Sequence, residues 1–231
     1  MLVTTEGLVL KSIKYGDNSI ISTVYTLEEG LISTISARKM GNKNKSSIFL
    51  QAFSLIQLVF YSKRNQSLNR TKELSFLAED GNAYDDVSKN AIRFFIAEFL
   101  CHVIKEKEKN PFLYTYLKES SLQLNSSEKF DPCFHLNFLM GLSKLIGIQP
   151  NTESTGIYFN LNEGEFCNTK PINTFLENSS CISLRKFFDE EETLSKIERK
   201  QVLNALLDYY RVQLDNDLPL KSKDVLEVVF S

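Results

Sequence analysis

The sequence predicts an α+β fold, in which a small closed β-barrel of five strands is followed by an α-helical domain. Three observations support this prediction. The first 80 residues contain short runs rich in Ile, Val, Thr, Phe and Tyr, which are typical of strands. Beyond Asp85 the apolar residues recur at helical spacing. The chain has 231 residues and is 42% hydrophobic, which is ample for a buried core.

Five runs in the N-terminal part are expected to be strands, because turn residues such as Tyr15-Gly16-Asp17-Asn18 and Glu28-Glu29-Gly30 separate them. The run 53–61 is apolar on both faces, which fits a strand between the barrel interior and another domain. Five strands in about 75 residues favour an OB-fold β-barrel over residues 1–80. The expected strands are Gly7–Lys14, Ser19–Leu27, Leu31–Ala37, Phe53–Tyr61 and Arg70–Leu77.

Residues 81–231 are expected to form the helical domain, with the boundary near Asp80-Gly81-Asn82. The segment Phe94–Ile104 is apolar nearly all round, which indicates a buried helix. A small hairpin that turns at Gly164 is expected within residues 157–167, where helical periodicity is lost. The remaining expected helices are Pro111–Leu124, Pro132–Ile146, Ser195–Leu214 and Ser222–Phe230.

Residues for catalysis or metal binding are scarce. The sequence has no P-loop, Gly-rich dinucleotide turn, nucleophile elbow, His-Glu-x-x-His or Cys-x-x-Cys motif. Glu98 and His102 share one helical face with Cys101 beside them, which allows a metal or acid–base site, but a polar seam within a helix bundle is favoured. Cys133 and His135 are two positions apart and would not face each other on a helix. We therefore expect no enzyme, no cofactor and no metal.

The composition also predicts where the protein resides. No apolar stretch follows a basic N-terminus, so we expect no secretory leader. Four cysteines are then expected to be reduced thiols in the cytoplasm. The longest apolar run, 48–61, is too short and too polar to span a bilayer, so no membrane association is expected.

Charge is divided unevenly along the chain. Residues 1–72 hold 10 Lys and Arg against 4 Asp and Glu, whereas residues 73–231 hold 17 against 25. A basic N-terminal part suggests contact with a polyanion, and chance asymmetry between two solvated surfaces is the alternative.

The cations of the N-terminal part are clustered around two turns. Small and polar residues, Gly41, Asn42 and Asn44, separate the first group and would let it follow phosphates. Strand tyrosines could stack on bases, although many such tyrosines are core residues with a solvated hydroxyl. The candidate DNA-binding residues are Arg38, Lys39, Lys43, Lys45, Lys63, Arg64 and Arg70, and the candidate stacking residues are Tyr15, Tyr25 and Tyr61.

Ordered blocks of sequence resemble the RecO family of bacterial recombination mediators. The first blocks are Glu6-Gly7-Leu8-Val9-Leu10, Tyr15-Gly16-Asp17-Asn18-Ser19, Ile21, Tyr25-Thr26, Gly30-Leu31 and Ala37-Arg38. Later blocks are Leu142–Leu145 with Gly147-Ile148-Gln149-Pro150, then Phe159, Glu163-Gly164, Cys167 and Leu218-Pro219-Leu220-Lys221-Ser222. No single block is very specific, but the ordered set from residue 6 to residue 222 is.

The resemblance implies an N-terminal OB domain, a C-terminal helical domain, and binding of single- and double-stranded DNA. It also implies strand annealing, assistance to RecA loading, a place at the bacterial nucleoid, and partnership with RecR and with the acidic tail of single-stranded DNA-binding protein. That tail ends in acidic residues and a Phe, so we expect an exposed apolar groove edged by cations in the helical domain. The sequence offers Arg185, Lys186, Arg199 and Lys200 for its edge.

The chain departs from the family at one point. Many members carry a four-Cys zinc site, with one pair after the Gly-x-x-Pro helix and a second pair at the hairpin. Here residues 151–156 contain no Cys, and the hairpin keeps only Cys167. Zinc is therefore not expected.

The sequence thus predicts a DNA-repair mediator that binds DNA without sequence specificity and is not an enzyme. The rival interpretation is a protein-only adaptor, whose basic loop docks an acidic partner. A hydrolase built on Glu98 and His102 would lack a nucleophile and an oxyanion site.

Overall fold

The computed structural model describes residues 1–37, 50–62, 67–77, 86–105, 108–126, 131–172, 174–190 and 193–230. The chain divides into two compact units, residues 1–130 and residues 131–231. The domain boundary expected near residues 80–82 lies outside the described residues and stays a prediction. The first unit continues beyond it, because two helices pack with the barrel.

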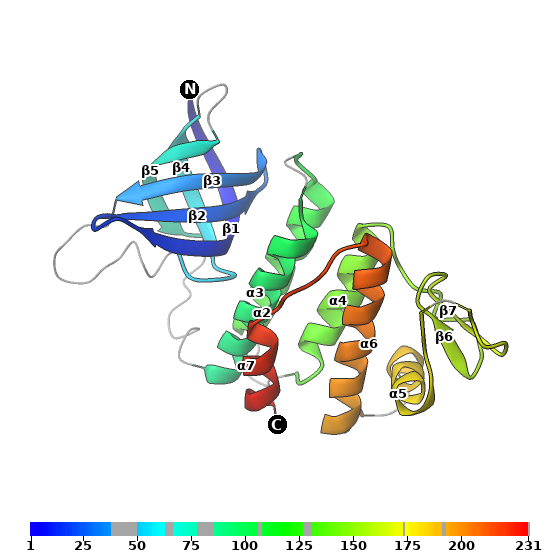
Figure 1. Ribbon diagram of the computed structural model, residues 1–231. Helices are drawn as coiled ribbons and strands as arrows, with labels where there is room; N and C mark the ends of the chain where they lie inside the picture. The colour runs from blue at the N-terminus through cyan, green and yellow to red at the C-terminus, as the bar shows by residue number, and fades with distance from the viewer. Residues whose placement is uncertain are drawn as a thin grey trace. The chain divides into compact units, whose positions relative to one another are not determined.

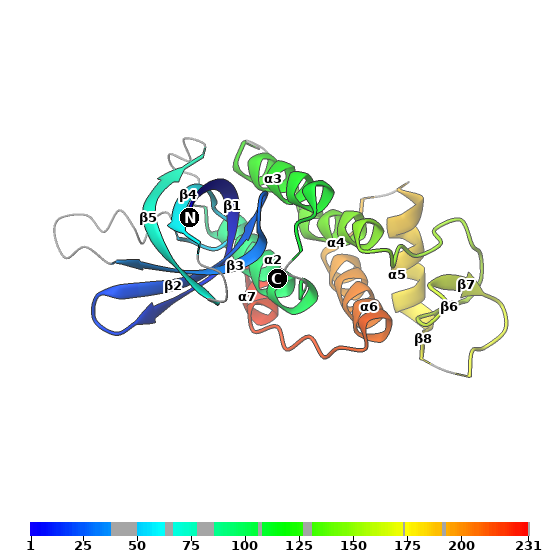
Figure 2. The same ribbon diagram turned by 90° about the horizontal axis from the view of Figure 1, so that it is seen from above.

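Five strands form a closed barrel in the first unit, in the order β1-β2-β3-β5-β4 (Figures 1 and 2). The long first strand closes it, because residues 2–8 pair with β4 and residues 7–15 pair with β2. Only the pairing of β3 with β5 is parallel. The strands are β1 (Leu2–Tyr15), β2 (Ser19–Thr26), β3 (Gly30–Ala37), β4 (Leu55–Tyr61) and β5 (Leu68–Phe76). The predicted five-stranded barrel is confirmed.

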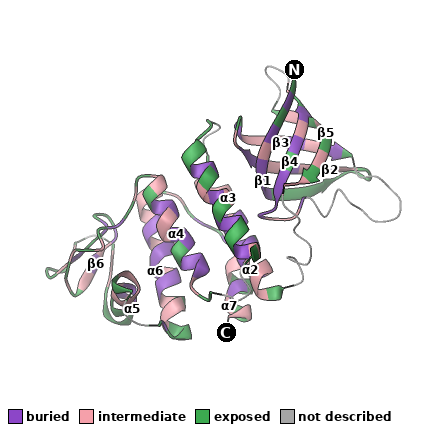
Figure 3. Cartoon of the chain, turned by 180° about the vertical axis from the view of Figure 1, so that it is seen from behind, coloured by how far each residue is buried: buried purple, intermediate pink, exposed green. Residues whose placement is uncertain are grey.

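An apolar core fills the barrel, and buried and exposed residues alternate along several strands (Figure 3). Gly7 is required where β1 crosses β2, because a Cβ there would lie 2.6 Å from Val24 Cγ1. The expectation that both faces of the fourth strand are covered is wrong. Leu55, at the start of the outward face, is buried, but Gln57 and Tyr61 on the same face are exposed, so that face is covered only in part. The core residues include Val3, Val9, Ile20, Val24, Ile56, Leu58 and Phe60.

Two helices complete the first unit, α2 (Val87–Val103) and α3 (Pro111–Ser126). The Asp86 side chain caps α2, and the helix packs against β1 with both Phe95 and Phe99 fully buried. The buried helix predicted from its apolar circumference is therefore confirmed. Glu6 of β1 holds α3 in place, because it accepts hydrogen bonds from Lys118 Nζ at 2.7 Å and from the Tyr114 hydroxyl at 3.2 Å.

The second unit contains four helices and a small sheet among its described residues. Its helices are α4 (Phe134–Leu145), α5 (Asn178–Asp189), α6 (Lys196–Leu214) and α7 (Ser222–Val229). The sheet has the order β7-β6-β8, with β6 at Tyr158–Asn160, β7 at Glu165–Cys167 and β8 at Phe175–Leu176. Helix α6 packs against both α4 and α5. Helix α5 was not expected from the sequence.

The predicted hairpin is confirmed as β6 and β7, which turn at Gly164. Gly164 has a φ of 69°, and a Cβ there would lie 2.6 Å from the Tyr209 hydroxyl. That hydroxyl donates to the Ile148 carbonyl at 2.8 Å. The turn is thereby packed against α6. Among the described residues, no helix has the length and apolar character needed to cross a membrane.

Candidate nucleic-acid interface and partner groove

One row of paired residues crosses the outer surface of the barrel. Ile13 pairs with Ile21, Ile21 with Ile35, Ile35 with Arg70, and Arg70 with Tyr61. Directly paired residues place their side chains on the same face of a sheet. Ile13 is 48% exposed, Tyr61 is 45% exposed and Arg70 is also exposed. We call these five residues the outer row.

The neighbouring row on the inner surface is polar. Ser12 pairs with Ser22, Ser22 with Thr34, and Thr34 with Asn69. The Ser12 and Ser22 hydroxyls are hydrogen-bonded at 2.9 Å, and Ser22 and Thr34 are each only 1% exposed. Ser12 itself is exposed, so the buried polar residues of this row are Ser22 and Thr34. At these two positions the barrel places small polar groups inside, while the half-buried Ile21 and Ile35 lie on the outer face, the reverse of the ordinary arrangement. An apolar strip that the core does not require is typical of a binding surface.

Two of the three candidate stacking tyrosines border this strip. Tyr15 is 59% exposed, and it lies two positions beyond Ile13 on the same face of β1. Tyr61 belongs to the outer row. The prediction for Tyr25 is wrong, because its ring is 1% exposed. Tyr25 pairs with Leu8 in the part of the barrel that α2 covers, so its side chain belongs to the core.

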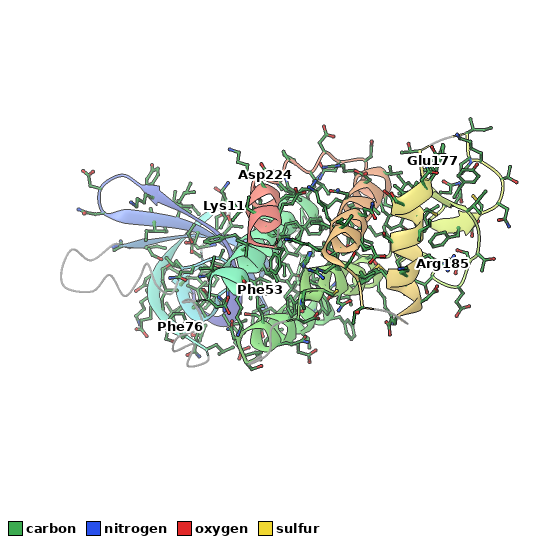
Figure 4. The ribbon with its side chains drawn as sticks, turned by 90° about the horizontal axis from the view of Figure 1, so that it is seen from below. Lys11, Phe53, Phe76, Glu177, Arg185 and Asp224 are labelled. Carbon is green, nitrogen blue, oxygen red and sulfur yellow. The ribbon has the colours of Figure 1, made fainter. Side chains whose placement is uncertain are left out.

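Cations accompany the same surface. Lys11, labelled in Figure 4, lies on the face of β1 that carries Ile13, and it is exposed. Arg70 of β5 is exposed as well. The other six candidate DNA-binding residues lie outside the described residues: Arg38, Lys39, Lys43, Lys45, Lys63 and Arg64. Their positions in the sequence show which described strands they adjoin. Segment 38–49 follows Ala37, which pairs with Ser19, and Ser19 pairs with Tyr15. Segment 63–66 joins the strands that carry Tyr61 and Arg70.

A groove of about 470 Å³ lies between the first half of α6 and α7. Its apolar lining includes Ile197, Leu203, Leu226, Val228 and Phe230. Its charged lining comprises Lys196, Arg199, Lys200, Asp224 and Glu227. We call it the α6–α7 groove. It has the chemistry that the sequence predicted for the helical domain, an apolar hollow with cations at its edge.

His135 of α4 forms part of the lining of this groove. Burial, assisted by the nearby Arg199 guanidinium, lowers the pKa of His135 to about 4, so the imidazole is neutral at pH 7. Its ring lies 5.9 Å from the Phe230 ring. Lys200 Nζ contacts Glu227 Oε2 at 2.7 Å. That hydrogen bond, together with the charges of Lys200 and Lys223, holds the pKa of Glu227 below its ordinary value.

The four predicted edge cations separate into two pairs. Arg199 and Lys200 line the α6–α7 groove, whereas Arg185 and Lys186 of α5 line a second hollow beside the hairpin. Arg185 is occupied there by the carbonyls of Thr152 and Ser154, and Lys186 contacts Glu198 at 2.8 Å (Figure 4 labels Arg185). Arg199 and Lys200 are engaged as well, by the Leu194 carbonyl at 2.8 Å and by Glu227 at 2.7 Å. The α6–α7 groove is distinguished instead by the apolar lining beside its cations.

The residues considered for metal binding do not assemble into a site. No group of three His, Cys, Asp or Glu side chains among the described residues could hold a metal ion. Glu98, Cys101 and His102 are half-buried on α2, and the polar seam between Glu98 and His102 stays a prediction. At the hairpin, the Cys167 thiol donates to the Thr169 carbonyl at 3.3 Å, and the Arg185 guanidinium contacts the segment where the family would place its first Cys pair. These residues do not fit a zinc ion. We expect elemental analysis of the purified protein to find no stoichiometric zinc.

Comparison with known proteins gives the same family across the whole chain. The family model "Recombination protein O N terminal" matches residues 1–79, and "Recombination protein O C terminal" matches residues 84–224. Two relatives named "DNA repair protein RecO", from Phocaeicola vulgatus and Flavobacterium psychrophilum, are 34% and 30% identical to it. A third with the same name, from Bacteroides fragilis, is 32% identical. In all three cases the match covers 100% of both chains.

Proposed function

The chain belongs to the RecO family of DNA repair proteins, and we propose that it is a non-enzymatic mediator that binds single- and double-stranded DNA without sequence specificity. In this proposal it anneals strands and, together with RecR, assists RecA loading onto DNA coated by single-stranded DNA-binding protein. The same proposal places it in the bacterial cytoplasm at the nucleoid.

The observation that carries the proposal is the outer row of the barrel. Its isoleucines and the adjoining Tyr15 and Tyr61 offer a flat apolar surface for unpaired bases, which stack on aromatic rings whatever their sequence. Lys11 and Arg70 supply cations beside it for phosphates. Segments 38–49 and 63–66, with six further cations, are joined to strands of the same surface. OB-fold barrels use this combination to hold single strands.

Substitution of the two exposed tyrosines tests the proposal. We expect Tyr15→Ala and Tyr61→Ala each to weaken binding of a single-stranded oligonucleotide at least about fivefold, because one stacked base contributes about 1 to 3 kcal/mol. Double-stranded DNA should be affected less, since its bases are already stacked on each other. Phe112→Ala is the matched control, because Phe112 is an aromatic residue of α3 that is 80% exposed and lies outside the barrel surface. Equal affinities of both tyrosine variants and the wild type would remove the outer surface from the DNA site.

We also propose that the α6–α7 groove binds the tail of single-stranded DNA-binding protein. Lys196 and Lys200 are exposed at its edge, and Ile197 and Leu203 of α6 give it an apolar lining for the terminal Phe. Calorimetry with a tail peptide tests this assignment, and we expect micromolar binding that Lys200→Gln weakens. If the peptide does not bind at high micromolar concentrations, this partner should be dropped.

The rival function is a protein-only adaptor, in which the cations of residues 38–45 contact an acidic protein and no DNA is bound. The two functions differ in one measurable property. Contact with DNA phosphates releases counterions, so affinity for unstructured oligonucleotides falls steeply with salt concentration. An adaptor would show no such binding. The exposed apolar strip beside two tyrosines favours the DNA mediator.

A further inference from the structure

Helix α7 forms one wall of the α6–α7 groove, and it contacts the groove through two kinds of group. Glu227 reaches across to Lys200 of α6 at 2.7 Å. Phe230, next to the end of α7, lies against the buried His135 with ring centroids 5.9 Å apart. The groove therefore already has an acidic group at its edge and an aromatic ring at its apolar lining, both supplied by the chain itself.

The contacts made by α7 indicate which ligand the groove accepts. The groove is lined by three cations, two carboxylates and a neutral imidazole, so the cations are only partly balanced. A peptide with carboxylates and an aromatic side chain would complement both the cations and the apolar lining. Such a peptide has the same two kinds of group as Glu227 and Phe230. One of its carboxylates can take the place of Glu227 on Lys200.

The attachment of α7 is weak enough for such an exchange. Among its residues, only Leu226 is buried, whereas Val225 and Val228 are 51% and 73% exposed. Glu227 contacts Lys223, at 3.7 Å, as well as Lys200. Its carboxylate therefore keeps an ion-pair partner when it leaves Lys200. Helices with few buried side chains open locally at low free-energy cost.

We propose that α7 is an internal competitor of the α6–α7 groove, and that Glu227 occupies Lys200 until an acidic, aromatic peptide displaces it. This inference rests on the proposed function of the groove and adds its regulation. Affinity for the external peptide is then set by competition with α7 as well as by the contacts that the peptide makes.

The test compares peptide affinities of the intact protein and its Glu227→Gln variant. The probe is a fluorescent peptide of four aspartates and two apolar residues that ends in Phe, and the readout is anisotropy. We expect Glu227→Gln to bind this probe about two- to fivefold more tightly, because the substitution frees Lys200 from a partly exposed ion pair. Asp208→Asn is the matched control. It removes an ion pair within α6, between Asp208 and Arg211 at 2.6 Å, and neither Asp208 nor Arg211 lines the groove.

A second pair of variants, made in Lys200→Gln protein, tests whether Lys200 is the cation for which Glu227 and the peptide compete. In Lys200→Gln protein, a further Glu227→Gln change should give no gain in affinity, because the two residues act on each other. If the wild type binds the peptide and Glu227→Gln binds it equally or more weakly, the competition is refuted while the groove remains a peptide site. If no variant binds the peptide, both the peptide site and the competition are refuted. DNA affinity measured on the same samples shows whether the DNA-binding function stands independently.

Discussion

Arg185 joins three parts of the second unit through one guanidinium group. It donates to the carbonyls of Thr152 and Ser154 in the segment after α4, it pairs with Asp189 at 3.7 Å, and it lies 3.7 Å from the ring centroid of Phe166 in the hairpin. Thr152 and Ser154 are half-buried, and hydrogen bonds from a charged donor are among the stronger polar contacts in proteins. The arginine thus holds in place residues 151–156, a segment that contains no Cys to bind a metal.

We expect Arg185→Ala to lower the free energy of unfolding by about 2 to 3 kcal/mol, since it leaves two carbonyls without their charged donor. Arg185→Lys should recover only part of this stability, because an ammonium group cannot reproduce the planar fork. The measurement is urea unfolding followed by circular dichroism. Lys170→Ala is the control, because Lys170 also lies over a ring, that of Phe175, but is largely exposed, and its removal should cost less than about 1 kcal/mol. Similar destabilisation by both alanine variants would contradict this role.

The buried His135 makes stability depend on pH. Its pKa is about 4 in the folded protein against 6.5 when it is free, so the unfolded chain binds the additional proton as the pH falls below about 6.5. This contribution to stability is complete above pH 6.5 and declines progressively between pH 6.5 and 4. We expect a decrease of about 2 kcal/mol between pH 7.5 and pH 5.

His135→Gln should remove this dependence, and His102→Gln should retain it, which makes the chain's two histidines a matched pair. Urea midpoints at the two pH values provide the measurement. An unchanged pH dependence in His135→Gln would show that another group is responsible.

At the residue scale, the sequence predicted which types of side chain matter, cations and aromatics, better than it predicted where each of them lies. Arg185 was expected at a partner groove, but it binds backbone carbonyls instead. Tyr25 was a candidate for stacking, but it is buried. In β2, Ile20 and Ile21 are adjacent, and nothing in their order tells which one faces the interior. That choice depends on the pairing register, which places Ile21 outside and Ser22 inside.

At the scale of elements, turn chemistry and apolar periodicity were sufficient for the barrel and for five helices. Strand β2 lies between Gly16 and Gly30, both of which adopt positive φ, and β3 begins at Gly30. Helix α5 was missed although Cys181, Leu184 and Phe188 recur at i, i+3 and i+7. It begins with Asn178 and two serines, and its described buried residues are Cys181, Ser183 and Leu184. Such a helix depends on tertiary packing, here against α6, more than on its own periodicity.

The segment between β3 and β4 carries the element-scale prediction for DNA binding. Arg38, Lys39, Lys43 and Lys45 lie within it. It follows Ala37 of β3, which is separated from Tyr15 of β1 by Ser19 of β2. We expect replacement of both Lys43 and Lys45 by Glu to weaken binding similarly for any sequence. The slope of log affinity against log salt should flatten by about 1 to 2, because each lysine that binds a phosphate adds about 0.7 to that slope.

Folding of this double variant should be preserved, because surface changes of this kind usually cost within about 0.5 kcal/mol each. Salt-titrated anisotropy gives the slope, and circular dichroism verifies the fold. A folded double variant with wild-type affinity and slope would exclude Lys43 and Lys45 as DNA ligands and direct attention to Lys63, Arg64 and Arg70.

At the scale of the whole molecule, charge and chemistry are divided along the chain. Residues 1–72 carry an excess of positive charge, and residues 73–231 an excess of negative charge. The first part contains nearly all of the barrel with its outer row, and the second contains the α6–α7 groove. Because an acidic C-terminal part would repel phosphates, we propose that nucleic acid is directed to the barrel and that the groove is left for a protein partner. One chain can then hold DNA and the protein that coats it.

The central claim is that the barrel binds DNA chiefly through phosphates and stacked bases, without reading sequence. Salt-titrated fluorescence anisotropy of the intact protein, with two single-stranded oligonucleotides of equal length and unrelated sequence, tests it most directly. We predict similar affinities for both and a linear fall of log affinity with log salt, with a slope of about 3 to 5, from about four to seven bound phosphates at about 0.7 each. Failure to bind either strand at low salt, or an affinity that salt does not change, would contradict the account and favour the protein-only adaptor.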